Sequence, residues 1–257
     1  MHAVETPTLH LVRHAQGYHN LSVENHSIPD PQLTPYGKEQ CASLHKSFPY
    51  MDKVDLIVAS PIKRTIYTAL LSFASVIESK NLRVIALPEL QETSDLPCDT
   101  GSSVEEVERE FAGQPVDLSI LKKEEYKTWN NKKGRWAPNA KAIEARAKDA
   151  RKWLMERKEK NIVVVTHGGF LHYFTEDWAD YSNVAGTGWA NTEFRSYTFD
   201  LSKQDGASLV ETPESRRLRS GTEKPMDSEE KANIQETTQN GAEQNGYYKV
   251  SEIQAKV

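Results

Sequence analysis

Hydrophobic and polar residues follow two different patterns along the first 210 residues. Four short runs are nearly continuously apolar and rich in β-branched residues, which is typical of strands that are buried on both faces of a mostly parallel sheet. A fifth run alternates only partly and predicts one further strand. The five predicted strands span residues 8–12, 56–59, 84–87, 162–165 and 194–199.

Segments with a helical period lie between these strands. Thr34 and Ser60 each stand directly before a proline, which predicts a helix N-terminus at both positions. The helix after Ser60 is expected to keep an apolar face as far as Ile77. A long amphipathic helix is predicted after Asn139, because its apolar residues are spaced four, three and four positions apart. Another helix is predicted after His167.

The alternation of strands and helices predicts one domain over residues 1–210. Its expected architecture is an α/β fold, a three-layer α/β/α sandwich with a mostly parallel central sheet and right-handed crossovers. Residues 94–139 are longer than an ordinary connection, so we expect them to form a cap insertion over one end of the sheet. Ser103 and Glu106 have capping-box spacing, which predicts a short helix inside this cap.

The composition changes after residue 210. In residues 211–257, 11 of 47 residues are apolar, and Phe and Trp are absent. Such a segment buries too little apolar surface to offset the conformational entropy lost on ordering it. We therefore expect a polar, largely disordered C-terminal tail after a short ordered stretch near residues 211–219.

Composition also limits the cellular context and the partners. No apolar run approaches the roughly 18 residues that a membrane helix needs, so no membrane partner is expected. The N-terminus lacks the basic and apolar regions of a secretory signal, and two cysteines are too few for a disulfide framework. These features predict a cytoplasmic protein. The net charge of -5 argues against general nucleic-acid binding. The oligomeric state is left open.

Charged and imidazole side chains follow the predicted strands. The first strand runs into Arg13 and His14, and the fourth runs into His167. Arg64 falls in the first helical turn after the second strand, and Glu89 and Glu92 follow the third. Because ligands of open α/β sheets bind at the carboxyl ends of the strands, we expect two histidines, two arginines and a carboxylate to gather at one edge of the sheet.

Together these residue types suit phosphoryl transfer. Arginine presents a planar fork of donors that matches phosphate oxygens and stays charged, and helix N-termini favour anions. A neutral imidazole can attack phosphorus and carry the phosphoryl group. A second histidine can donate to the transferring oxygens, and a protonated carboxyl can give its proton to the leaving alkoxide.

Four ordered motifs resemble those of the histidine phosphatase superfamily, the phosphoglycerate mutase-like fold. Arg-His-Ala at residues 13–15 is similar to the family's Arg-His-Gly signature. Leu-Thr-Pro-Tyr-Gly-Lys-Glu-Gln at 33–40 resembles its Leu-Thr-x-x-Gly-x-x-Gln helix start. Ser-Pro-Ile-Lys-Arg-Thr at 60–65 resembles Ser-Pro-x-x-Arg-Thr/Ala, and Val-Thr-His-Gly-Gly at 165–169 resembles the second histidine motif. The resemblance covers about residues 8–200.

This resemblance implies roles for individual residues. His14 is the expected phosphohistidine nucleophile. The side chains expected to hold the phosphoryl oxygens are Arg13, Arg64 and His167, with Asn20 assisting. Glu92 stands where the family has its proton donor, and Glu89 and Asp95 remain alternatives for that role.

The family needs no metal for the transfer, and no cofactor is expected. A zinc site built from His14, His19 and His167 is conceivable, but a liganding carboxylate at suitable spacing is not evident in the sequence. The expected partner is therefore a small phosphorylated substrate alone.

Two departures from the family pattern bear on the activity. Gln16 stands where glycolytic mutases usually have glutamate, and residues 93–99 differ from the continuation found in the mutases. The Arg-His-Ala-Gln-Gly form resembles fungal and plant members of the phosphatase-like branch. We therefore expect a metal-independent phosphomonoesterase that acts on a small phosphorylated metabolite through phosphohistidine. The alternatives are a mutase-type phosphotransferase and a non-catalytic phospholigand-binding module.

Overall fold

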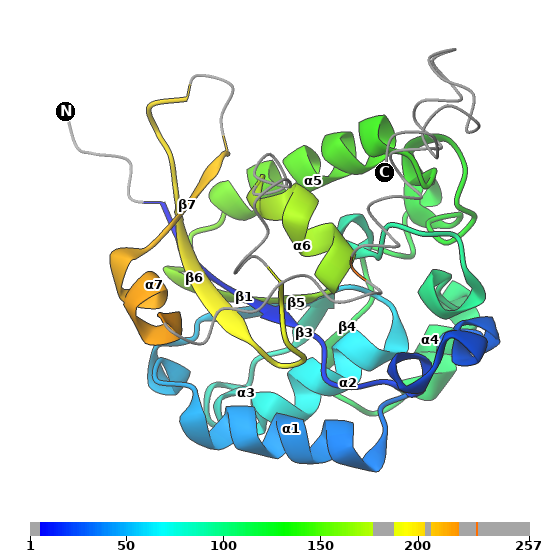
Figure 1. Cartoon of the computed structure of the whole chain (residues 1–257), viewed down its shortest axis with the longest axis horizontal. Helices are drawn as coiled ribbons and strands as arrows, with labels where there is room; N and C mark the ends of the chain where they lie inside the picture. The colour runs from blue at the N-terminus through cyan, green and yellow to red at the C-terminus, as the bar shows by residue number, and fades with distance from the viewer. Residues whose placement is uncertain (1–5, 177–187, 204–206, 221–229, 231–257) are drawn as a thin grey trace, which may run out of the picture.

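The computed structural model describes residues 6–176, 188–203, 207–220 and Glu230. Within these ranges, seven strands form one sheet in the order β4-β3-β2-β5-β1-β6-β7 (Figure 1). Strands β1 to β5 pair in parallel, and β6 and β7 pair antiparallel at one edge. The strands are β1 (Thr8–Arg13), β2 (Leu56–Ala59), β3 (Val84–Ala86), β4 (Val116–Asp117), β5 (Asn161–Thr166), β6 (Phe194–Phe199) and β7 (Leu209–Glu211).

Helices cover both faces of this sheet, which confirms the predicted three-layer α/β fold. Helices α1, α2 and α3 lie on one face and α5 and α6 on the other (Figure 1). The helices are α1 (Pro35–Ser47), α2 (Lys63–Ser72), α3 (Ala74–Lys80), α4 (Val104–Glu110), α5 (Ala140–Met155), α6 (Gly168–Thr175) and α7 (Pro213–Arg219).

The apolar run of β1 is explained by burial on both faces. Leu9 and Leu11 pack in the core beneath α5 and α6, whereas Val12 packs in the core beneath α1 and α2. Successive side chains of a strand point to opposite faces, so a central strand that is covered on both faces is mostly apolar. Strand β5 divides its valines and its isoleucine between the two cores in the same way.

Two predicted helix starts are confirmed by their caps. The Thr34 hydroxyl accepts a hydrogen bond from the Gly37 amide (2.9 Å). The Asn139 side chain accepts one from the Ala142 amide (3.0 Å), and α5 begins at the next residue. The capping box that was predicted at Ser103 is also present, at the start of α4.

The helix predicted directly after Ser60 is wrong in two respects. Helix α2 begins only at Lys63, and the amide of Lys63 donates to the Asp30 carboxylate (2.9 Å) rather than to Ser60. The helix also ends before Phe73, and α3 continues as a separate helix past the expected Ile77. Ser60 does not cap because its hydroxyl faces His167, as described below.

The proposed cap, residues 94–139, is anchored to the domain along much of its length. It contains α4, the edge strand β4 and three 3-10 turns, η5 (Pro97–Asp99), η6 (Glu124–Tyr126) and η7 (Gly134–Trp136). Its residues Trp129 and Trp136 pack in a separate apolar cluster with Ile62 and Ala86. The apolar pattern did not predict β4, because two residues are too few to show a period.

The short ordered stretch expected near residues 211–219 corresponds to β7, which begins at Leu209, and α7. Glu211 anchors this stretch, since its carboxylate accepts hydrogen bonds from Arg219 (2.7 Å) and from the Ser215 hydroxyl (2.9 Å). Apart from residues 211–220 and Glu230, the predicted disordered tail lies outside the described residues. The division between domain and tail therefore stays a proposal.

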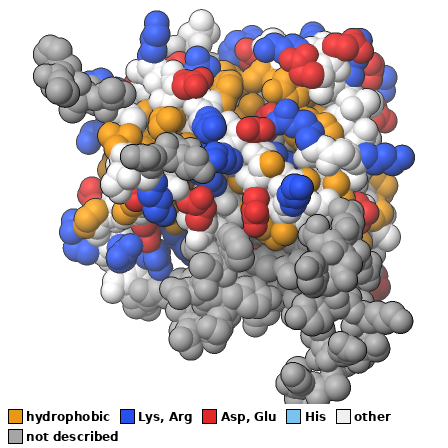
Figure 2. All heavy atoms as spheres, turned by 90° about the horizontal axis from the view of Figure 1, so that it is seen from above, with side chains coloured by type: hydrophobic (Ala, Val, Ile, Leu, Met, Phe, Trp, Pro, Cys, Tyr) orange, Lys and Arg blue, Asp and Glu red, His pale blue; other side chains and the backbone are white. Residues whose placement is uncertain are grey.

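The surface of one face carries charges of both signs. In Figure 2 the Lys and Arg side chains are intermixed with Asp and Glu, and apolar side chains lie between them. None of the helices in the described ranges has the length and hydropathy needed to cross a membrane.

Candidate active site

The two motif histidines lie side by side because their strands are paired. Arg13 at the end of β1 is in register with Thr166 at the end of β5. His14 and His167 follow these residues, and their ring centroids are 5.2 Å apart. Both side chains are fully buried. Two imidazoles that are far apart in the sequence thus come close enough to contact one tetrahedral anion.

Hydrogen bonds define the tautomer of His14. Its Nδ1 lies 2.8 Å from the carbonyl oxygen of Ala15, and a carbonyl can only accept, so Nδ1 carries the proton. Its Nε2 faces the Nε–H of Arg64 at 3.2 Å, and this nitrogen must be the acceptor. The ring is therefore neutral, with the lone pair of Nε2 directed into the site.

His167 is held as the opposite tautomer. Its Nδ1 accepts from Nη2 of Arg64 (3.0 Å), so Nε2 carries the proton and donates to the Ser60 hydroxyl (2.9 Å). Burial, followed by the nearby charge of Arg64, lowers the pKa of His167 well below its usual value. This histidine is neutral, and its single N–H, on Nε2, is the group that can donate to a bound anion.

Arg64 connects both histidines to the loop that follows Glu92. Besides contacting the two imidazoles, its guanidinium donates to the Cys98 carbonyl (2.6 Å) and to the Asp99 carboxylate (2.8 Å). The side chain is fully buried. Its position in the first turn of α2 directs it toward the strand ends, as the sequence predicted.

Arg13 lies across the N-terminus of α6. Its guanidinium donates to the carbonyl of Trp189. A Cβ at position 168 would lie only 3.2 Å from Cζ of Arg13, so Gly168 permits this close approach. The guanidinium therefore adds a positive charge where helix N–H groups already favour an anion.

Glu92 is fixed at the same helix N-terminus. Its Oε1 accepts from the amides of Thr93 and Phe170 (both 2.8 Å), and its Oε2 accepts from the amide of Gly169 (3.2 Å). The carboxyl is buried. This arrangement places Glu92 next to the residues that directly follow His167.

Arg146 of α5 holds the backbone of this loop. Its guanidinium donates to the carbonyls of Glu89 (2.7 Å), Gln91 (2.6 Å) and Glu92 (3.0 Å). Burial lowers the pKa of Arg146 to about 9, which still leaves it charged at neutral pH. Arg146 thereby orients the segment that carries the candidate proton donor.

The two alternatives to Glu92 occupy different surroundings. Glu89 pairs with Arg135 (2.8 Å), and its burial raises the pKa of the carboxyl. Asp95 is exposed. Of the three carboxyls, Glu92 is the one that bonds to the start of α6.

The loop after His14 is tied to the start of α1 by the second motif. The Gln16 carbonyl accepts from the Thr34 amide (3.0 Å), and the Gln16 amide donates to the Gln40 side chain (2.8 Å). A Cβ at position 37 would lie 2.2 Å from the Gln16 carbonyl oxygen, so Gly37 is required for this approach. The spacing of the motif thus fixes the backbone beside His14.

Asn20 and His19 lie in the next turn of the same loop. The Asn20 side chain accepts from the Gly17 amide (2.9 Å) and so stabilises the loop itself. His19 is fully buried, with its ring centroid 5.3 Å from that of His14. Burial, followed by the charge of Arg64, lowers the pKa of His19 well below its usual value.

In the described ranges, no set of three or more His, Cys, Asp or Glu side chains is arranged to hold a metal ion.

The sequence analysis missed several residues around this site. It considered His19 only for a zinc site and Ser60 only as a helix start, and it gave no role to Asp99. Lys132 of the proposed cap donates to the Glu92 carbonyl (3.0 Å), and burial lowers its pKa to about 7. No sequence pattern links Lys132 to the strand ends, because it enters from an irregular segment 40 residues after Glu92.

Glu230 is another residue near the site that no sequence pattern indicated. It is buried, accepts from the Trp189 amide (2.9 Å) and lies 3.8 Å from Nη1 of Arg13. A residue of the polar tail therefore contacts an arginine of the candidate site.

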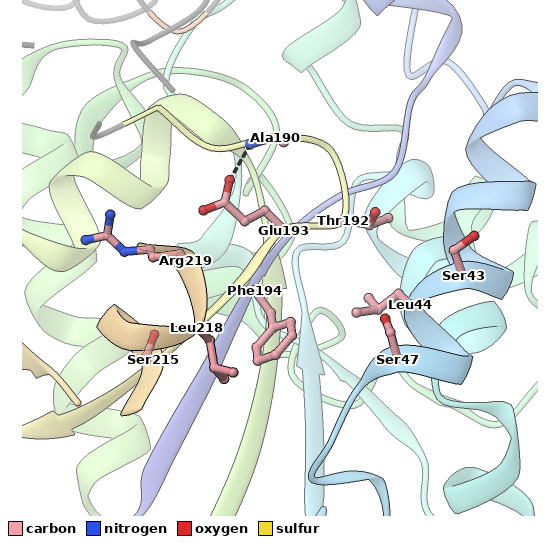
Figure 3. A pocket seen from close by; sticks show the side chains of 10 residues that line it. All are labelled: Ser43, Leu44, Ser47, Ala190, Thr192, Glu193, Phe194, Ser215, Leu218 and Arg219. Atoms are coloured by element: carbon pink, nitrogen blue, oxygen red, sulfur yellow. Dashed lines mark hydrogen bonds between the residues drawn. The ribbon is translucent and has the colours of Figure 1, made fainter. Parts of the chain in front are cut away.

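An open surface pocket lies apart from these imidazoles, between α1, the start of β6 and α7 (Figure 3). Its Arg219 is already paired with Glu211, and its Glu193 accepts from the Ala190 amide (2.8 Å). The side chains that line it offer no imidazole, thiol or unpaired guanidinium. This pocket therefore lacks the imidazoles that meet at the strand ends. The lining residues are Ser43, Leu44, Ser47, Ala190, Thr192, Glu193, Phe194, Ser215, Leu218 and Arg219.

The fold and the paired histidine motifs define a protein of the phosphoglycerate mutase-like class. The pattern of the histidine phosphatase superfamily (branch 1) matches residues 9–211, and this chain belongs to that family. It is 34% identical over 200 residues to a phosphoglycerate mutase-like protein of Arabidopsis thaliana, covering 64% of this chain and 72% of the relative. It is 28% identical over 169 residues to a probable phosphatase of Schizosaccharomyces pombe, covering 65% and 76%.

Solved structures share the fold. A mycobacterial glucosyl-3-phosphoglycerate phosphatase matches with a TM-score of 0.50 at 17% identity, covering 80% of this chain and 97% of the other. The family and its phosphatase members support a phosphatase. At this identity, the structural likeness carries information about the fold and not about the substrate.

Proposed function

We propose that this protein is a metal-independent phosphomonoesterase that hydrolyses a small phosphorylated metabolite through a phosphohistidine at His14. The observation that carries the proposal is the tautomer of His14. A neutral ring with its proton on Nδ1 directs the lone pair of Nε2 toward Arg64, and His167 stands beside it. This is the arrangement that an imidazole nucleophile requires.

In the first step, Nε2 of His14 forms a bond to phosphorus while the ester P–O bond breaks. The phosphoryl group takes the place that Nε of Arg64 occupies at Nε2, 3.2 Å away. Arg13 and Arg64 neutralise the phosphoryl oxygens, His167 helps to orient them, and Asn20 supports the loop between them. Fixed donors of this kind stabilise the charge that develops in the transition state.

Protonated Glu92 gives its proton to the leaving alkoxide. Oε2 suits this role, since its contact to the Gly169 amide is longer (3.2 Å) than the two contacts of Oε1. In the second step, the Glu92 carboxylate accepts a proton from water as that water attacks phosphorus. The P–N bond breaks, phosphate leaves, and His14 and Glu92 return to their initial states.

Hydrolysis is favoured over the mutase alternative by Gln16 and by the relatives that are named as phosphatases. The composition also supports a cytoplasmic location, since two cysteines are too few for a disulfide framework.

The test uses the purified full-length protein with a chelator present. Phosphate release is measured over a panel of sugar phosphates, phosphoglycerates, nucleotides, inositol phosphates and prenyl diphosphates. The wild type is expected to hydrolyse at least one class and to form an acid-labile, alkali-stable phosphoenzyme. His14→Ala is expected to abolish both, whereas His45→Ala, which changes an imidazole of α1 outside the site, is expected to retain them.

Full turnover in the His14 variant would refute the proposed nucleophile. Isomerised phosphoglycerate without net phosphate release would favour the mutase alternative. Phosphate binding without turnover of any class would indicate a non-catalytic module.

A further inference from the structure

The segment that departs from the mutase pattern, residues 93–99, ends in a buried carboxylate. Oδ1 of Asp99 accepts from Nη2 of Arg64 (2.8 Å), and Oδ2 accepts from the Ser94 hydroxyl (2.7 Å). The neighbouring Cys98 carbonyl accepts from Nη1 of Arg64 (2.6 Å). This loop therefore contacts both terminal nitrogens of the guanidinium.

The donors of Arg64 are almost all assigned. A guanidinium has five N–H groups in one plane. Nε donates to His14, the two N–H groups of Nη2 donate to Asp99 and His167, and one from Nη1 donates to Cys98. Within the described ranges, one N–H of Nη1 has no protein acceptor. Asp99 thus fixes the rotation of the plane, so that the edge formed by Nε and Nη2 faces the two imidazoles.

Burial makes this orientation sensitive to Asp99. The side chains of Arg64 and Asp99 are 0% and 2% exposed, so water is not available to replace a lost partner. Removing one partner of a buried ion pair leaves the other charge uncompensated. Arg64 would then turn toward the acceptors that remained, which are the Cys98 carbonyl and the nitrogens of His14 and His167.

We propose that Asp99 is a positioning residue for the phosphoryl transfer, which holds Arg64 so that its donors face the phosphoryl group on His14. The inference rests on the proposed function. It assigns a role to the loop after Glu92 that sets this chain apart from the mutases. The competing interpretation is that the Asp99–Arg64 pair only stabilises the fold.

The decisive variant is Asp99→Asn, which keeps the shape and one acceptor oxygen but removes the charge. We expect kcat to fall roughly tenfold, since a charge-assisted hydrogen bond is about twice as strong as a neutral one, with KM changed by less than about threefold. Inhibition by vanadate, which mimics the transition state, is expected to weaken by the same factor as kcat. Inhibition by inorganic phosphate is expected to weaken less.

Asp52→Asn is the control, because Asp52 is an exposed aspartate that lies before β2, at the opposite end of that strand from Ser60. It is expected to match the wild type in kcat, vanadate affinity and thermal stability. Asp99→Ala is expected to lose roughly a hundredfold in kcat. The Asn variant decides the question even where the Ala variant does not fold.

Wild-type kcat and vanadate affinity in Asp99→Asn would overturn the proposal, as would a lower thermal stability with unchanged kcat. Failure of the proposed function has a different signature, since the wild type itself would then show no turnover.

A second observation, independent of Asp99, concerns Glu230. Besides its contacts to Trp189 and Arg13, its Oε1 lies 3.6 Å from Nε2 of His172. Its Cγ would lie 2.9 Å from a Cβ at position 168. The carboxylate therefore lies against the first residue of α6, where an anion is favoured.

We infer that Glu230 competes with phosphate for Arg13 and the start of α6, as an autoinhibitory contact supplied by the same chain. A carboxylate and a phosphate oxygen accept from the same guanidinium donors. The two anions also repel each other when both are close to one site. The alternative is that Glu230 orients Arg13 for substrate, which would require the carboxylate for binding.

The two interpretations predict opposite changes in phosphate affinity when the carboxylate is removed. In Glu230→Gln, we expect inorganic phosphate to bind several-fold more tightly by isothermal titration calorimetry. Glu214→Gln changes an exposed glutamate of α7 and is expected to bind phosphate like the wild type. Unchanged or weaker phosphate binding in Glu230→Gln would overturn the inference. Because binding is measured without turnover, this result does not depend on whether the protein hydrolyses a given substrate.

Discussion

Gly37→Ala tests whether the helix-start motif serves the site or only the helix. A methyl group at this position would lie 2.2 Å from the Gln16 carbonyl oxygen, whereas ordinary contacts begin near 3.4 Å. The loop must therefore move by about 1 Å to accept it. That movement is opposed, because the Gln16 backbone is bonded on one side to Thr34 and on the other to Gln40.

Two effects of opposite sign set the expected stability. Alanine is favoured over glycine within a helix by about 1 kcal/mol, whereas overpacking in a tight contact costs about 1–3 kcal/mol. We expect a net loss of about 1–2 kcal/mol in the free energy of unfolding. Turnover is expected to fall much further, because a misplacement of about 1 Å beside a nucleophile can cost roughly a hundredfold.

Urea unfolding and steady-state kinetics on the same preparations separate these effects. Lys38→Ala is the matched control, since Lys38 is the next residue of α1 and is exposed. It is expected to change neither quantity appreciably. If Gly37→Ala were as stable and as active as the wild type, the argument that the motif positions the loop beside His14 would be refuted.

Three further expectations follow from individual contacts. Burial lowers the pKa of His10 from 6.5 to about 4, so the wild type should lose up to about 3 kcal/mol of unfolding free energy as the pH falls through that window. His10→Gln should lose measurably less in urea titrations, and an identical pH dependence would contradict this. Asn139→Ala removes the cap on the Ala142 amide and should cost about 1 kcal/mol, seen as a lower urea midpoint. Ser60→Ala removes the acceptor of His167, and kcat should fall about tenfold at nearly unchanged thermal stability; unaltered kcat would exclude an orienting role.

Most of the central fold could be predicted because it depends on local patterns. The strands through Val12 and Val164 are mostly apolar since both faces are buried, and that pattern is visible in a single sequence. The caps at Thr34 and Asn139 are equally local. Strand β4 was not predicted, because a two-residue strand is too short to show a local pattern.

The residues that carry the site could be predicted only where the topology alone brings them together. His14 and His167 were expected to meet because each follows a parallel strand. Asp99 and Lys132 reach the site from irregular backbone, where no repeating geometry relates sequence distance to position. Ser60 was assigned to a helix cap from a correct motif, since the sequence does not show that its hydroxyl would face an imidazole instead.

The contacts of Arg64 explain why the motifs of this chain are coupled. One guanidinium contacts the nucleophile, the second histidine and the loop that follows the candidate proton donor. A change in any of these three segments alters the direction of the same planar group, so their effects on turnover should be non-additive. A double variant of Asp99→Asn with Ser60→Ala is expected to lose less than the product of the two single losses, because both act on the geometry between Arg64 and His167. Strictly multiplicative losses would indicate that the two residues act independently.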